Sequence, residues 1–244
     1  MRERQTPPCD RGRLLWEELG LGPGLRVLVV PPHPDDECLT GLLPLRLQHE
    51  AGAKVDVRAA TYGSSEARRT ERRRELEAAC KTLGWRVLGR GTTPLTVAEL
   101  SALLAKGQYA LVLCPHAKDG HPRHRATHRL VRAAIQTLEA PAPLVAETDY
   151  WMPLERPNLA VEGTKKHLDA LTTALRQHQG EVARNDYDRR LWAWWVDNIR
   201  RGSESLSGPG AAGIGLEAGE MYRLVRPSST RWRPAWPGGK VVGK

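Results

Sequence analysis

Short apolar runs alternate with amphipathic segments from residue 25 to residue 147, and this alternation limits the fold more than any other feature. Strands are predicted from apolar runs at 25–30, 109–114 and 143–147, and from alternating apolar and polar residues at 55–61. Helices are predicted between and after them, at 39–50, 70–83, 97–104 and 122–138. Such alternation is typical of a parallel sheet with both faces covered. We therefore expect an α/β protein, a Rossmann-like three-layer sandwich with a mostly parallel central sheet.

The length of 244 residues suits one large α/β domain. We expect a lead-in segment at 1–24, the domain itself at 25–226, and a basic, Pro- and Gly-rich, loosely ordered tail at 227–244. No apolar stretch is long enough to span a membrane, and no signal-peptide pattern follows the N-terminus. The four cysteines lack CxxC spacing, so we expect reduced thiols and a cytoplasmic protein.

The net charge of +9 leaves several partners open. It permits binding to nucleic acid or another polyanion, and it would also attract an anionic small substrate. A general bias toward Arg would produce the same charge without any partner. Charge alone therefore does not select among these readings, and the sequence also leaves homo-oligomerisation open.

The first candidate site is His33-Pro34-Asp35-Asp36-Glu37, which closely follows the run at 25–30. One imidazole and three carboxylates thus lie past the carboxyl end of a predicted strand, where ligands bind in open α/β sheets. Such a cluster suits a divalent metal with a general base beside it.

The second candidate site follows the predicted strand at 109–114 and contains His121 and His124. Two parallel strands bring such loops to the same edge of a sheet, so His33, Asp36 and His124 are expected to converge on one metal. Two imidazoles and one carboxylate favour Zn²⁺, with Fe²⁺, Co²⁺ or Mn²⁺ as alternatives.

These residue types suit metal-assisted hydrolysis. The metal would acidify water and polarise a carbonyl, and a free carboxylate would accept the proton of the water. An imidazole opposite would stabilise the oxyanion or protonate a leaving amine. The spacing does not decide which of Asp35 and Asp36 is the ligand and which is the base.

Both motifs together resemble the PIG-L/LmbE-like family of metal-dependent N-acetylglucosamine deacetylases. The segments that carry the resemblance are His33 to Glu37 with Gly41, and Asp119-Gly-His121-Pro-x-His124. Looser similarity lies at 61–63, 72–84, 166–179 and 220–223, so that the resemblance spans about 25–225. It implies an LmbE-like fold and a zinc-dependent hydrolase that removes an N-acetyl group from an amino-sugar conjugate.

The resemblance also implies a role for each site residue. The metal ligands would be His33, Asp36 and His124. Asp35 would be the general base, and His121 the imidazole that stabilises the oxyanion or donates a proton.

The same resemblance implies Arg72 and Glu37 as residues that contact or orient the substrate. At Arg123 the chain departs from the family pattern, because the family usually has Asp there. A cation at this position would disfavour protonated His121, and it would suit an anionic group of the substrate. Arg123 is therefore the third expected substrate-binding residue.

Two other functions remain open on the sequence. One keeps the metal site but hydrolyses a different N-acyl amide. The other is a basic nucleic-acid or polyanion-binding protein with a degenerate metal site, which rests on the charge and on Arg123.

Overall fold

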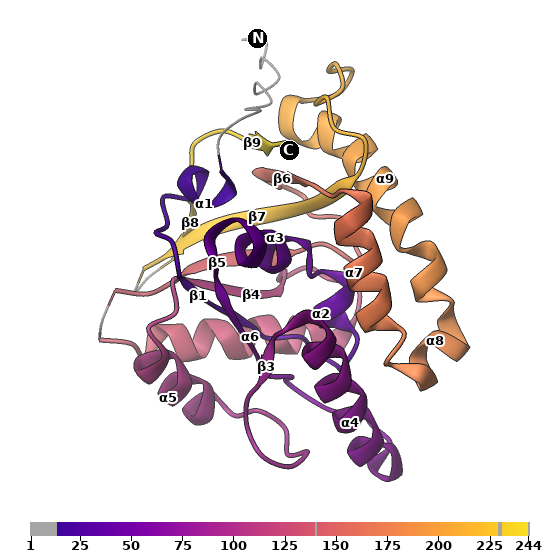
Figure 1. Cartoon of the computed structure of the whole chain (residues 1–244). Helices are drawn as coiled ribbons and strands as arrows, with labels where there is room; N and C mark the ends of the chain where they lie inside the picture. The colour runs from indigo at the N-terminus through magenta and orange to yellow at the C-terminus, as the bar shows by residue number, and fades with distance from the viewer. Residues whose placement is uncertain (1–13, 140, 229–230, 244) are drawn as a thin grey trace.

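The computed structural model describes residues 14–139, 141–228 and 231–243, and it shows an α/β sandwich (Figure 1). The strands are β1 Arg26–Val29, β2 Lys54–Val57, β3 Arg86–Val87, β4 Leu111–Pro115, β5 Leu144–Thr148, β6 Leu159–Glu162, β7 Gly219–Pro227, β8 Trp232–Pro234 and β9 Lys240–Val242. The helices are α1 Leu15–Glu18, α2 Asp36–Leu39, α3 Leu42–Ala51, α4 Glu66–Leu83, α5 Val97–Gly107, α6 Pro122–Gln136, α7 Lys165–Leu175, α8 Gln179–Asn185 and α9 Tyr187–Ser207.

The strands form one mixed, mostly parallel sheet, as expected from the sequence. Their order is β3-β2-β1-β4-β5-β7-β6-β9, and β8 pairs with β7. The five strands from β3 to β5 run parallel, whereas β7 is antiparallel to both β5 and β6. Strands β2 and β3 follow β1 toward one edge of the sheet, and β5 follows β4 toward the other edge. The neighbours β1 and β4 therefore mark the switch point of the sheet, where α/β proteins bind ligands.

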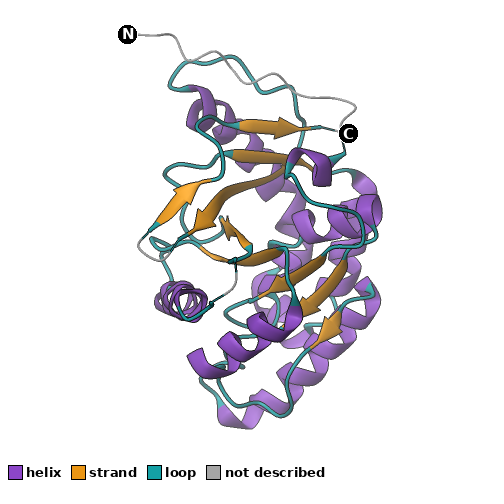
Figure 2. Ribbon diagram, turned by 90° about the vertical axis from the view of Figure 1, so that its left-hand side faces the viewer, coloured by secondary structure: helices purple, strands orange, loops and turns teal. Residues whose placement is uncertain are grey.

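Helices cover both faces of the sheet (Figure 2). In β1, Val27 and Val29 belong to the largest hydrophobic cluster, whereas Leu28 between them belongs to a second cluster on the opposite face of the sheet. The larger cluster is closed by α3, α4, α7 and α9, and the smaller one by α5 and α6. Because successive strand residues point to opposite faces, a strand with helices on both sides is apolar throughout. The expected three-layer arrangement is confirmed.

The acidic motif leads into two short helices rather than one long helix. Helix α2 ends at Leu39, and α3 begins at Leu42. Gly41 lies between them because a Cβ there would be 2.4 Å from the Glu37 carbonyl oxygen. The chain therefore turns within two residues, and the expected helix at 39–50 is divided.

The end of the described chain is more ordered than expected. Strand β9 pairs with β6, and β8 pairs with β7, so the expectation of a loosely ordered tail was wrong for these residues. The buried Arg46 of α3 donates to the carbonyl oxygens of Val242 and Gly243 at 3.2 Å each. The division at 24 and 226 stays a prediction.

Three of the cysteines, Cys38, Cys80 and Cys114, are buried free thiols, and Cys9 lies outside the described residues. None of the described helices combines the length and the apolar character needed to cross a bilayer.

Candidate metal centre

The two motifs meet at the switch point of the sheet. His33 lies in the loop after β1 and Asp36 is the first residue of α2, while His124 lies in the first turn of α6, after β4. Strands β1 and β4 are parallel and directly paired, with Val29 opposite Leu113. Both loops therefore leave the sheet at the same edge, as the sequence predicts.

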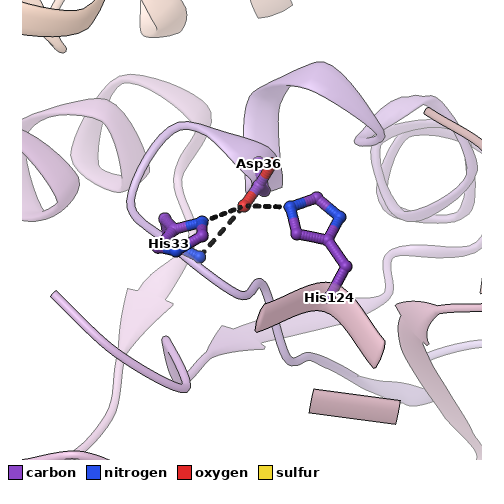
Figure 3. Close-up of side chains that lie close together, drawn as sticks. All are labelled: His33, Asp36 and His124. Carbon is purple, nitrogen blue, oxygen red and sulfur yellow. Dashed lines mark hydrogen bonds and ion pairs between the residues drawn. The ribbon is translucent and has the colours of Figure 1, made fainter. Parts of the chain in front are cut away.

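Three side chains present metal-ligating atoms to one point, and Figure 3 shows them around the Asp36 carboxylate. The potential ligand atoms of His33, Asp36 and His124 all lie within 4.8 Å of one another. Asp36 Oδ2 is 3.4 Å from His33 Nδ1 and 3.6 Å from His124 Nε2. Two imidazoles and one carboxylate with an open side fit a divalent metal of the zinc type.

The members of this donor set shift one another's pKa values. Burial alone would raise the pKa of Asp36, but His124 and His33 outweigh it and hold that pKa below its ordinary value. Burial would lower the pKa of His124, but Asp36 and Asp119 raise it instead. Asp119 Oδ2 lies 3.2 Å from His124 Nδ1, so a carboxylate orients the ring from behind.

Asp35 occupies a different position from Asp36, which the spacing alone left undecided. It lines the pocket beside the three ligands, and its backbone has a φ of 114°, a left-handed value rare for residues other than glycine. Burial raises the pKa of Asp35 well above its ordinary range, the neighbouring Asp36 adds to this, and Arg72 opposes it. The Arg72 guanidinium lies 3.9 Å from Asp35 Oδ1 and donates to the Pro34 carbonyl at 2.9 Å.

Glu37 does not line the pocket. Its side chain is fully buried beneath the pocket, where Oε2 accepts from the Asp35 backbone N–H at 2.9 Å. Its other oxygen lies 2.6 Å from His178 Nε2. No part of Glu37 reaches the pocket surface, so the structure does not support direct contact with the substrate. An orienting role through the backbone of Asp35 stays a prediction.

His121 and Arg123 also line the pocket, at the start of α6. The Arg123 backbone N–H points at His121 Nδ1 at 3.3 Å, and an unprotonated Nδ1 accepts such a bond. The ring proton is then carried by Nε2. Burial and the neighbouring His124 and His33 lower the pKa of His121. Protonated His121 is therefore disfavoured, as the sequence predicts. The cause is burial together with two imidazoles, whereas the sequence analysis attributed the effect to Arg123.

The metal centre opens into a pocket of about 530 Å³. Its walls also include residues that the sequence reasoning did not single out, among them Tyr150, Glu181, Arg184 and Tyr187. Glu181 of α8 is buried and lies 3.6 Å from Arg72 Nη2. The similarity at 166–179 ends at Gln179, the first residue of α8, and does not reach these residues.

The fold is similar to that of several solved proteins. N,N'-diacetylchitobiose deacetylase from Pyrococcus horikoshii is 20% identical with a TM-score of 0.61, covering 86% of this chain and 90% of that one. A teicoplanin deacetylase, Orf2, solved in its "zinc inhibited form", is 17% identical with a TM-score of 0.54, covering 84% and 100%. The hydratase GalB from Pseudomonas putida KT2440, which acts on 4-carboxy-2-hydroxymuconate, is 20% identical with a TM-score of 0.63, covering 85% and 98%.

These similarities establish the fold and leave the reaction open, because deacetylases and a hydratase share it. No curated protein sequence matches the chain. The family described as PIG-L, GlcNAc-PI de-N-acetylase, matches residues 28–135, the segment from β1 to α6 that carries both motifs of the metal centre. By that match, residues 28–135 of the chain are similar to the PIG-L family.

Proposed function

We propose that this protein is a metal-dependent N-deacetylase that hydrolyses the N-acetyl group of an amino-sugar conjugate. The observation that carries the proposal is the convergence of His33, Asp36 and His124 within 4.8 Å, with Asp35 beside them in the same pocket. The family match supports a deacetylase, and the printed name of the Pyrococcus horikoshii protein supports an acetylated sugar as substrate.

Zn²⁺ is the proposed metal, held by His33, Asp36 and His124, with Fe²⁺, Co²⁺ or Mn²⁺ as alternatives to be tested. When bound, such an ion supplies a Lewis acid that polarises the acyl carbonyl and acidifies water. Zinc was present in an inhibited form of a teicoplanin deacetylase, so the test includes all four metals. Asp119 holds the His124 ring in position from the far side.

Asp35 is the proposed general base. It accepts a proton from the attacking water and returns it to the leaving nitrogen, a task that suits a carboxyl whose pKa burial has raised. Arg72 lies close enough to steady the carboxylate while it is ionised. The contact from Glu37 to the Asp35 backbone keeps this side chain turned toward the pocket.

His121 is proposed to donate its Nε2–H to the oxygen that gains negative charge. A neutral ring whose Nδ1 accepts from the Arg123 backbone has its proton on the opposite nitrogen, which suits this role better than donation of a full proton. Donation to the leaving nitrogen remains the second role considered for His121.

Arg123 is proposed to contact the substrate. Its side chain is exposed at the pocket wall and makes no hydrogen bond or ion pair with any residue that the structure describes. A free guanidinium at this place attracts a carboxylate or phosphate of the substrate. Arg72 makes hydrogen bonds within the protein, so we propose that it orients Asp35 more than it binds substrate.

The experiment compares metal content and acetate release in matched variants. Wild type is expected to hold about one metal per chain by mass spectrometry, and Asp36→Ala to lose it, because one of three protein ligands is removed. Asp169→Ala, an exposed carboxylate on α7, is the control and should keep the metal. Asp35→Asn should keep the metal and lose acetate release from N-acetylated sugar conjugates.

The alternatives give different results in the same experiment. Release of a longer acid but no acetate would favour another N-acyl amide. Wild-type protein without metal after reconstitution, together with salt-dependent binding of DNA or RNA, would favour the polyanion-binding alternative and contradict the proposal.

A further inference from the structure

An aromatic recess of about 370 Å³ opens beside the metal pocket. We call it the aromatic recess, and its main walls are Leu39, Tyr150, Trp151, Tyr187, Leu191 and Trp194. They come from α2, from the loop after β5, and from α9. All six of these side chains are leucine or aromatic, and the remaining lining residues are Arg190 and Ala193. Such a recess favours an apolar ligand group.

The recess is continuous with the metal pocket. Leu39, Tyr150, Trp151 and Tyr187 line both cavities, so a molecule bound in one extends directly into the other. Leu39 is the last residue of the helix whose first residue is Asp36. Side chains three apart on a helix are roughly 5–6 Å from each other, so the recess begins about one helical turn from the metal ligand.

The aromatic walls brace one another before any ligand binds. The Tyr150 ring meets three others edge to face: Trp151 at 5.4 Å, Tyr187 at 6.2 Å and Trp194 at 5.2 Å between centroids. Trp151 is nevertheless 49% exposed, which leaves much of an indole available for contact. Edge-to-face packing fixes ring orientation, so little ordering is needed when a ligand arrives.

We propose that the aromatic recess binds an apolar group, the size of a phenyl ring, attached to C1 of the sugar, the anomeric carbon adjacent to the carbon that carries the acetylated nitrogen. This assignment rests on the proposed deacetylase function. An acetyl group ends in a single methyl, which cannot fill such a volume, so the occupant belongs to the amine part of the substrate. The short distance from Asp36 to Leu39 requires that the apolar group be attached close to the amide. The substrate class is therefore an N-acetylated amino sugar with an apolar aglycone at C1.

Two surface substitutions on one helix test this assignment. Ala193 lines the recess, so Ala193→Trp should fill it with a side chain. Val196, 39% exposed on the same helix, does not line the recess, so Val196→Trp is the matched control. Both substitutions add an indole at an exposed position of α9, and both are made in Asp35→Asn protein so that the probes are not hydrolysed.

The probes are methyl and phenyl N-acetyl-β-D-glucosaminide, and the measurement is Kd by calorimetry. The phenyl glycoside should bind about tenfold more tightly than the methyl glycoside, as expected for partial burial of an aromatic ring. Ala193→Trp should remove this preference, and Val196→Trp should preserve it. Equal binding of the two probes, including no binding of either, would overturn the assignment, and so would equal effects of the two variants.

Two further measurements would show whether a different group occupies the aromatic recess. A methyl glycoside with a longer N-acyl chain that gains affinity, while the phenyl glycoside does not, would assign the recess to the acyl group. Self-association of the wild type that Ala193→Trp abolishes would assign it to a second copy. Either result overturns the proposal. These experiments measure binding affinity and not hydrolysis. Tighter binding of the phenyl glycoside without any acetate release would therefore support the proposed role of the aromatic recess and contradict only the proposed reaction.

Discussion

Glu37 Oε1 lies 2.6 Å from His178 Nε2, and neither side chain is exposed to solvent. Glu37 Oε2 accepts from the Asp35 backbone N–H, so the pair is connected to the residue with left-handed φ beside the metal ligands. A strained backbone conformation persists only where its surroundings hold it. His178, the residue that precedes α8, thus contributes to the position of Asp35 without lining the pocket itself.

Glu37→Gln should lower kcat at least about tenfold, because an amide cannot accept from Asp35 and face His178 in the same way. Metal content and KM should change little, since none of the three ligands contacts Glu37. Glu147→Gln is the control, because Glu147 forms another buried pair, with His128 at 2.9 Å, outside the pocket wall. A kcat within twofold of wild type would contradict this positioning role.

Asp119→Asn should weaken metal binding by about 10- to 100-fold, because it removes the negative charge that faces His124 Nδ1. Competition with a chelator of known affinity measures the change. Asp149→Asn is a suitable comparison, since Asp149 is equally buried but contacts the Leu154 backbone and Arg201. Equal metal affinity in wild type and Asp119→Asn would show that Asp119 has no part in holding the ligand.

Gly63→Ala should reduce activity as well as stability. Gly63 has a φ of +91°, and a Cβ there would lie 2.7 Å from Arg72 Nη1, so the guanidinium near Asp35 must move. Gly91→Ala is the matched variant, with a φ of +70° and no atom within 4 Å of the added Cβ. Both should lose about 1–2 kcal/mol of stability from backbone strain. Only Gly63→Ala should lose kcat, and parallel losses in both variants would contradict the role of Arg72.

Arg123→Asp should raise kcat on a verified neutral substrate several-fold. A carboxylate near His121 Nδ1 would favour the protonated ring, which donates the same Nε2–H to the oxyanion more strongly than the neutral ring does, and the substitution also removes a cation. On a substrate with a carboxylate or phosphate, the same variant should raise KM, because the free guanidinium at the pocket wall is lost. Arg123→Gln separates the two effects by removing only the cation. An unchanged or lower kcat in Arg123→Asp would refute the first expectation.

Glu220→Gln should flatten the dependence of stability on pH. Burial raises the pKa of Glu220 to about 8, against about 4.3 in an unfolded chain. The folded protein therefore keeps this proton where the unfolded chain releases it. The associated stability is complete below about pH 4, falls as pH rises, and is lost above about pH 8.

Denaturant unfolding of wild type and Glu220→Gln between pH 4 and 9 measures this effect. The free energy of unfolding of wild type should fall relative to the variant by on the order of a few kcal/mol across that range. Glu217→Gln, an exposed neighbour, should follow wild type. A constant difference between wild type and Glu220→Gln at every pH would contradict the raised pKa.

The metal centre could be predicted because local patterns determine most of it. Strands β1 and β4 are marked by uninterrupted apolar runs, and each is followed closely by its motif. Parallel pairing then brings His33, Asp36 and His124 together without any knowledge of the rest of the sheet. The sequence could not separate Asp35 from Asp36, because their positions differ by only one residue; in the fold, Asp36 clusters with His33 and His124.

The second half of the site depends on long-range packing and was not predictable. Helix α8 is only seven residues long, and nothing in its sequence indicates that Glu181 would reach Arg72. The position of Trp194 relative to Tyr150 depends on how α9 packs against β7 and α7. Strand β7 pairs with strands that precede it by many residues, so its place in the sheet has no local signal.

The single turn of α2 connects metal binding with the shape of the aromatic recess, two properties that could otherwise change separately in evolution. Asp36 at its start belongs to the metal centre, and Leu39 at its end belongs to the wall of the aromatic recess. An insertion or deletion in this helix would disturb both at once. Substitutions in α9 and at Trp151, by contrast, alter the recess without touching a ligand. New substrate ranges in descendants of this chain should therefore arise from α9 and from the loop after β5, while α2 keeps its length.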